Sequence, residues 1–146
     1  MRLCAILVTV ATLGLVGCDT AAPDRQTASF TASNGARVFP LGSGEFEVIT
    51  RSNSAWSGYF CGASDYARIR LGRSPSDRVV VTQAIGPART VPPGGRSVIF
   101  RVVPSNSGLP RTRFNPSIRR VGDNMSIGHA RAVCDNRTQG FFASSN

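Results

Sequence analysis

The sequence predicts an α+β fold, in which a small antiparallel β-sheet packs against one main α-helix. Two observations support this class. Apolar residues recur at steps of three and four over residues 54–72, which is the period of an α-helix. Short β-branched runs lie elsewhere in the chain, and a Pro-Pro-Gly-Gly turn separates two of them, which favours an antiparallel pair.

Three strands are predicted, one before this helix in the sequence and two after it. Residues 45–50 alternate in polarity, with Phe46 and Val48 on one face and two glutamates on the other. Residues 78–85 and 97–103 are the β-branched runs that flank the turn. We therefore expect them to form a hairpin beside the first strand.

The helix predicted over residues 54–72 has recognisable end signals. Ser54 is a plausible N-cap and Gly72 a plausible C-cap, with basic residues near the negative end of the helix dipole. Cys61 is expected beside the apolar stripe. That stripe is formed by Trp56, Phe60, Ala63, Ala67 and Leu71.

The last third of the chain is expected to contain a long loop and one more strand. Residues 104–124 are rich in Pro, Ser, Asn, Gly and Arg, so they read as a loop that could carry a binding surface. Residues 127–134 fit a strand whose faces differ in side-chain size. Depending on which face points inward, His129 is exposed or partly buried, and both possibilities stay open.

The start of the chain has the features of an export signal. Arg2 precedes an apolar run of 13 residues, from Cys4 to Val16. A secretory signal has one positive charge, a short apolar core and small residues at its end. A membrane-spanning helix needs about 20 residues, so this run favours a removable signal over a permanent anchor.

The end of that run, Leu15-Val16-Gly17-Cys18, resembles the lipobox of bacterial lipoproteins at all four positions. The resemblance implies cleavage after Gly17 and a diacylglyceryl group on Cys18, usually with a further acyl chain such as palmitate. Two or three acyl chains anchor a protein stably. The expected location is the cell envelope, facing the periplasm. Asp19 hints at the inner membrane, but inner and outer membrane both stay open.

These features divide the chain into a signal peptide (1–17), a lipidated tether (18–27) and a single small α+β domain (28–146). Removing 17 of the 146 residues leaves 129, about the size of one domain. The exported domain keeps two cysteines, Cys61 and Cys134. In an oxidising compartment two remaining thiols are expected to form a disulfide.

The charge of the exported chain is strongly positive. Every basic residue is Arg, and after removal of Arg2 there are 16 Arg against eight acidic residues, a formal charge of +8. Such a surface attracts anionic lipid, lipopolysaccharide, wall polymers or an acidic periplasmic protein, whereas nucleic acid is not an expected partner there. The densest group, and the expected contact site, comprises Arg111, Arg113, Arg119 and Arg120.

Catalytic and cofactor motifs are not found in the sequence. His129 is the single His, the cysteines lack Cys-x-x-Cys spacing, and a Walker-type phosphate loop is excluded because the chain has no Lys. Ser126 lies near His129 but without a Gly-x-Ser-x-Gly pattern. We expect no metal, no cofactor and no enzymatic activity, with an enzyme using His129 as the weakest alternative.

Residues 59–67, Tyr-Phe-Cys-Gly-Ala-Ser-Asp-Tyr-Ala, resemble a helix motif of uncharacterised small exported proteins of alphaproteobacteria. The resemblance covers about half of the exported chain and implies no activity. Asp65 and Tyr66 could be surface recognition residues. We expect instead that they are structural, with Asp65 paired to an Arg. The predicted function is a noncatalytic binding or structural module for an anionic envelope component. The alternative is an inhibitor or accessory subunit of a periplasmic enzyme, acting through residues 104–124.

Overall fold

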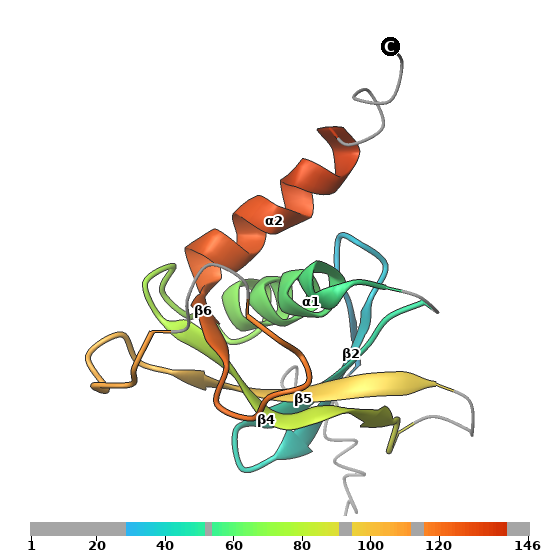
Figure 1. Ribbon diagram of the computed structural model, residues 1–146, viewed down its shortest axis with the longest axis horizontal. Coiled ribbons are helices and arrows are strands. Elements are labelled where there is room, and N and C mark those ends of the chain that lie inside the picture. Colours follow the sequence, from blue (N-terminus) through green and yellow to red (C-terminus); the bar gives the residue numbers. More distant parts are fainter. Residues whose placement is uncertain (1–28, 52–53, 91–94, 112–115, 140–146) are drawn as a thin grey trace, which may run out of the picture.

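The computed structural model describes residues 29–51, 54–90, 95–111 and 116–139, with side chains described as far as residue 134. The signal peptide, the tether with Cys18, and Arg113 lie outside the described residues. The described part confirms an α+β fold with a six-stranded antiparallel sheet, one main helix and a second helix (Figure 1). Its elements are β1 (Phe30–Thr31), β2 (Arg37–Gly42), β3 (Glu45–Ile49), α1 (Trp56–Ile69), β4 (Arg78–Pro87), β5 (Arg96–Val103), β6 (Asn124–Ser126) and α2 (Ile127–Gln139).

The sheet is built from two antiparallel parts that meet at β3 and β5. The strand order is β1-β2-β3-β5-β4-β6, so the β4–β5 hairpin joins the first three strands through its second strand. At this junction Phe46 pairs with Phe100 and Glu47 pairs with Ile99. The three strands predicted from the sequence are confirmed as β3, β4 and β5, whereas β1, β2 and β6 are additional.

Helix α1 lies across one face of the sheet, as Figure 1 shows. The Phe46 ring lies 4.7 Å from the Tyr66 ring, and the Phe60 and Phe100 rings are 5.2 Å apart in an edge-to-face arrangement. Gly62 allows the close approach, because a Cβ there would lie 2.9 Å from side-chain atoms of both Ala36 and Val48. Of the predicted apolar stripe, Phe60, Ala63 and Ala67 are buried in the core, whereas Trp56 is partly buried and Leu71 lies beyond the end of α1.

The ends of α1 differ from the sequence prediction. Its N-cap is Ala55, because the Ser54 N–H bonds to the Arg51 carbonyl and Ser54 belongs to the preceding turn. Its C-cap is Arg70, whose N–H bonds to the Tyr66 carbonyl. Gly72 lies beyond the helix with φ of +61°, a left-handed conformation that glycine adopts without strain.

The strand predicted over residues 127–134 is wrong, because this segment forms the first part of α2. The Ser126 hydroxyl accepts the His129 N–H at 3.3 Å, which is the hydrogen bond of an N-cap residue. Ile127 and Ala130 are buried and Cys134 is partly buried, a spacing of three and four residues that matches a helix. His129 is exposed.

A disulfide and an ion pair join the two helices. The predicted Cys61–Cys134 disulfide is confirmed, with the two Cα atoms 5.2 Å apart. Asp65 is fully buried and accepts hydrogen bonds from Arg131 Nη1 at 3.2 Å and from the Ser33 N–H at 2.9 Å. Tyr66 is only 2% exposed, so this pair of residues is structural rather than a recognition surface.

Candidate functional site

A cavity of about 620 Å³ lies where three parts of the chain meet beside the start of α1. One wall is the end of β3 and the turn into α1, and the second is the β4–β5 hairpin. The third is residues 116–119, which belong to the stretch predicted as a loop and contain neither helix nor strand. Its volume lies within the range of about 300–1,000 Å³ that small-molecule sites have.

Each of these three walls contributes one arginine to the cavity: Arg51, Arg96 and Arg119. All three are exposed, and among the described residues no ion pair or hydrogen bond engages their guanidinium groups. Among the described residues that line the cavity there is no Asp or Glu. The site therefore presents three positive charges from separate parts of the sequence, and no acidic side chain of the described residues pairs with them.

Three aspartates of the described residues form ion pairs outside the cavity. Asp77 pairs with Arg73 at 3.1 Å and Asp123 with Arg120 at 3.1 Å, while buried Asp65 pairs with Arg131. In addition, α1 has no acidic residue in its first turn and no side-chain cap. The positive end of its dipole thus adds to the potential of the arginines.

The inner surface of the cavity is aromatic and apolar. Trp56 is half-buried and packs edge-to-face on Phe60, with ring centroids 6.2 Å apart. Ile118 is 9% exposed and Tyr59 only 3% exposed. Within the described part of the chain, no hydrogen bond reaches the Tyr59 hydroxyl, so it can bond to a molecule in the cavity.

A buried glutamate fixes the hairpin that forms one wall. Glu47 is fully buried and accepts hydrogen bonds from the Arg89 N–H at 2.7 Å, the Thr90 N–H at 3.0 Å and the Ser97 hydroxyl at 2.6 Å, and from the Thr90 hydroxyl. Burial alone would raise the pKa of Glu47. The hydrogen bonds outweigh burial and hold its pKa below the ordinary value of 4.5.

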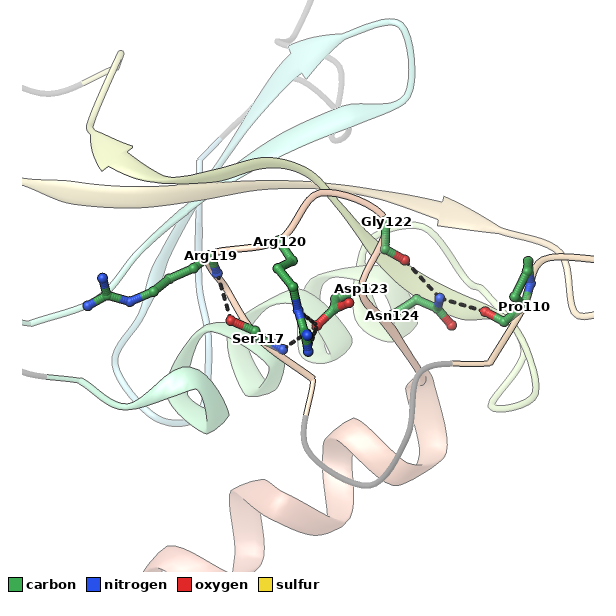
Figure 2. Close-up of polar contacts among 7 residues, drawn as sticks. All are labelled: Pro110, Ser117, Arg119, Arg120, Gly122, Asp123 and Asn124. Carbon is green, nitrogen blue, oxygen red and sulfur yellow. Dashed lines mark hydrogen bonds and ion pairs between the residues drawn. The ribbon is translucent and has the colours of Figure 1, made fainter.

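The arginines predicted to form a cluster lie in different surroundings. Arg120 is paired with Asp123, and Figure 2 shows the Arg119 side chain extending away from this pair. Arg119 lines the cavity. Arg111 is exposed and lies near Arg78: burial lowers the pKa of Arg78, and the charge of Arg111 lowers it further. Of the three that the structure describes, only Arg119 lines the cavity, and Arg113 lies outside the described residues.

Asn124 holds the ends of the connecting loop in place. Its side-chain amide donates to the carbonyls of Pro110 at 3.0 Å and Gly122 at 2.9 Å (Figure 2). The Asp123 carboxylate accepts the Ser117 N–H at 2.6 Å. These contacts position residues 116–119 and therefore the cavity wall that carries Arg119.

Ser126 and His129, the residues considered for an enzyme, do not contact each other through their side chains. The Ser126 hydroxyl bonds to the backbone of His129, and the described residues offer no hydrogen-bond partner to the imidazole. Nor does this part of the chain gather three or more His, Cys, Asp or Glu side chains as a metal site requires.

Comparison of the chain with protein-family models, curated proteins and solved structures gives no match. In the described residues, neither helix is long and apolar enough to cross a membrane. Sequence reasoning missed Arg51, Trp56, Tyr59 and Arg96, although the single Trp beside a predicted helix start was a usable signal.

Proposed function

We propose that the protein is a lipid-anchored, noncatalytic binding module of the cell envelope, and that it holds an anionic envelope component in the arginine-lined cavity. The observation that supports the binding role is the convergence of Arg51, Arg96 and Arg119 on a cavity to which the described residues contribute no carboxylate. Phosphate and carboxylate groups are the partners that guanidinium groups bind best.

The envelope location is a proposal that rests on the lipobox at residues 15–18. Lipidation at Cys18 would keep a domain of formal charge +8 beside anionic head groups and polymers, which raises their local concentration. Cells fed radiolabelled palmitate should label the wild-type chain but not Cys18→Ser. Equal labelling of both chains would contradict the anchor.

Binding can be tested with glycerol 1-phosphate, the charged fragment shared by anionic phospholipid head groups and phosphate-containing wall polymers. The full chain, in an uncharged detergent, is titrated while the fluorescence of Trp56, the single Trp, is followed. We expect saturable binding of glycerol 1-phosphate and none of glycerol. Arg96→Ala/Arg119→Ala should weaken binding by about tenfold or more, since about 1.4 kcal/mol corresponds to tenfold.

The matched control is Arg68→Ala/Arg101→Ala, which removes two exposed arginines outside the cavity and lowers the net charge equally. This variant should bind almost as the wild type does. Equal weakening in both double variants would mean that overall charge, rather than the cavity, attracts the anion. That outcome would refute the proposed site.

A further inference from the structure

We infer that the cavity binds a small organic anion in which a phosphate, sulfate or carboxylate is joined to an apolar ring. The ring would lie against Trp56 and the charged group between the arginines. This inference rests on the proposed function and specifies the chemistry of its ligand. Three features of the cavity support it: its volume, the separation of apolar and charged residues, and the Tyr59 hydroxyl.

The volume exceeds what an inorganic anion needs. At about 620 Å³ the cavity has the size of sites that enclose whole organic molecules. A bare phosphate held by the arginines would leave most of this space to water. The apolar surface of Ile118 and Trp56 would then stay hydrated, whereas an apolar ring would cover it.

Charge and apolar surface occupy different depths of the cavity. Arg51, Arg96 and Arg119 are exposed, while Trp56 is half-buried and Tyr59 and Ile118 are at least nine-tenths buried. A ligand that satisfies both regions must have an apolar part that enters and an anionic group that stays near the solvent. Aromatic side chains favour flat rings because ring faces and edges attract one another at short range.

Tyr59 supplies a polar contact inside the apolar region. The residue is 3% exposed and lines the cavity, and the described residues leave its hydroxyl without a hydrogen bond. The hydroxyl oxygen is not among the fully buried unpartnered atoms of the described residues, so it is open to the cavity and a ligand atom can bond to it. An acceptor atom that links the ring to the anionic group would fit this position.

The same burial argues against a lipid bilayer surface as the ligand. A flat anionic surface can contact exposed Arg51, Arg96 and Arg119, but it cannot reach Tyr59 or Ile118 without entering the cavity. A compact molecule can contact both groups at once. Binding to a bilayer is therefore not expected, and the test below includes it as a contradicting result.

The test uses the full chain in an uncharged detergent and three probes of matched chemistry. Phenyl phosphate carries both ring and charge, glycerol 1-phosphate carries the charge alone, and benzyl alcohol carries the ring alone. Excitation at 295 nm makes Trp56 the reporter, and calorimetry gives an independent dissociation constant. We expect phenyl phosphate to bind at least tenfold more tightly than either of the other probes.

Variants then show which residues bind the charged group of the ligand and which residues bind its ring. Arg119→Ala should weaken phenyl phosphate binding severalfold and leave benzyl alcohol unaffected, whereas Tyr59→Phe should weaken phenyl phosphate binding more than glycerol 1-phosphate binding. Arg101→Ala, which lies outside the cavity, should not change the binding of any of the three probes. Circular dichroism confirms that each variant is folded. If Tyr59→Phe were unfolded, the comparison of the three probes on the wild type would still test whether the ligand combines a ring with an anionic group.

Each of the other outcomes contradicts either the ring subsite, the anion site or both. Equal affinity for phenyl phosphate and glycerol 1-phosphate would refute the ring and leave the proposed anion site standing. Benzyl alcohol binding as tightly as phenyl phosphate would refute the anion site, and with it the inference that the ligand is an anion. Absence of binding by all three probes would refute the ring and the anion site together. If phosphatidylglycerol vesicles changed Trp56 fluorescence while phenyl phosphate did not, the ligand would be a membrane surface and the inference would be wrong.

Discussion

Glu47 combines complete burial with a full set of hydrogen-bond donors. Replacing it with Gln removes the charge and points amide hydrogens at groups that are themselves donors. We expect Glu47→Gln to lower the free energy of unfolding by about 2–3 kcal/mol, the scale of lost hydrogen bonds to a charged group. Urea denaturation at pH 7 measures this difference.

The depressed pKa of Glu47 also predicts a dependence on pH. Because the folded pKa lies below 4.5, the ionised form is favoured in the folded state and its contribution is fully present at neutral pH. This contribution is lost as the pH falls below 4.5 and through the folded pKa. Glu47→Gln should flatten that part of the stability profile. The control Glu45→Gln, on the same strand and partly exposed, should change stability little; equal effects would contradict the role of Glu47.

At the level of elements, the packing of α1 on the sheet depends on Gly62. Alanine has a higher helix propensity than glycine by about 1 kcal/mol, so an isolated helix would gain from Gly62→Ala. Here the new methyl group would lie 2.9 Å from Ala36 Cβ and Val48 Cγ1, and overpacking typically costs about 1–3 kcal/mol. We expect net destabilisation, measured by thermal or urea unfolding.

The control for this prediction is Gly128→Ala in α2. A Cβ at Gly128 meets its nearest atom, the Pro75 carbonyl oxygen, at 3.4 Å, an ordinary contact. Gly128→Ala should therefore be neutral or stabilising. If Gly62→Ala behaved in the same way, the contact between α1 and the β2–β3 strands would be looser than the structure indicates.

The success of sequence reasoning at this level depended on how regular each pattern was. The stripe from Trp56 to Leu71 and the β-branched runs of β4 and β5 are long enough to define their periods. The segment that begins at Ile127 mixes small and polar residues, so alternation and helical spacing both fit it. Its helical period is evident once Ile127 and Ala130 are known to be buried and Cys134 to be bonded to Cys61.

At the level of the whole molecule, the Cys61–Cys134 disulfide spans 73 residues of sequence. Chain-entropy estimates for a loop of this length give about 4 kcal/mol of stabilisation. We expect Cys61→Ala/Cys134→Ala, or reduction of the wild type, to lower the melting temperature substantially. Adding a reductant to the double variant should cause no further change. A melting temperature unaffected by reduction would contradict this account.

The cavity could not be predicted from the sequence because its walls are brought together by the strand order. Arg51, Arg96 and Arg119 are far apart in the chain. The pairing of β3 with β5 brings Arg51 and Arg96 together, and the bond of the Ile85 N–H to the Ile118 carbonyl brings in Arg119. Local periodicity specifies neither that order nor the turn of the hairpin over Glu47. A count of basic residues therefore favoured the sequence-adjacent group around Arg119 and Arg120.

The pairing of β3 with β5 also has a kinetic consequence. Residues such as Glu47 and Ile99, 52 positions apart, must meet before the sheet is complete, and contacts of long sequence separation slow folding. Two walls of the cavity lie on opposite sides of this junction, so the cavity exists only after the slow docking step. A ligand can then reduce the rate of unfolding but cannot act as a template during the early stages of folding.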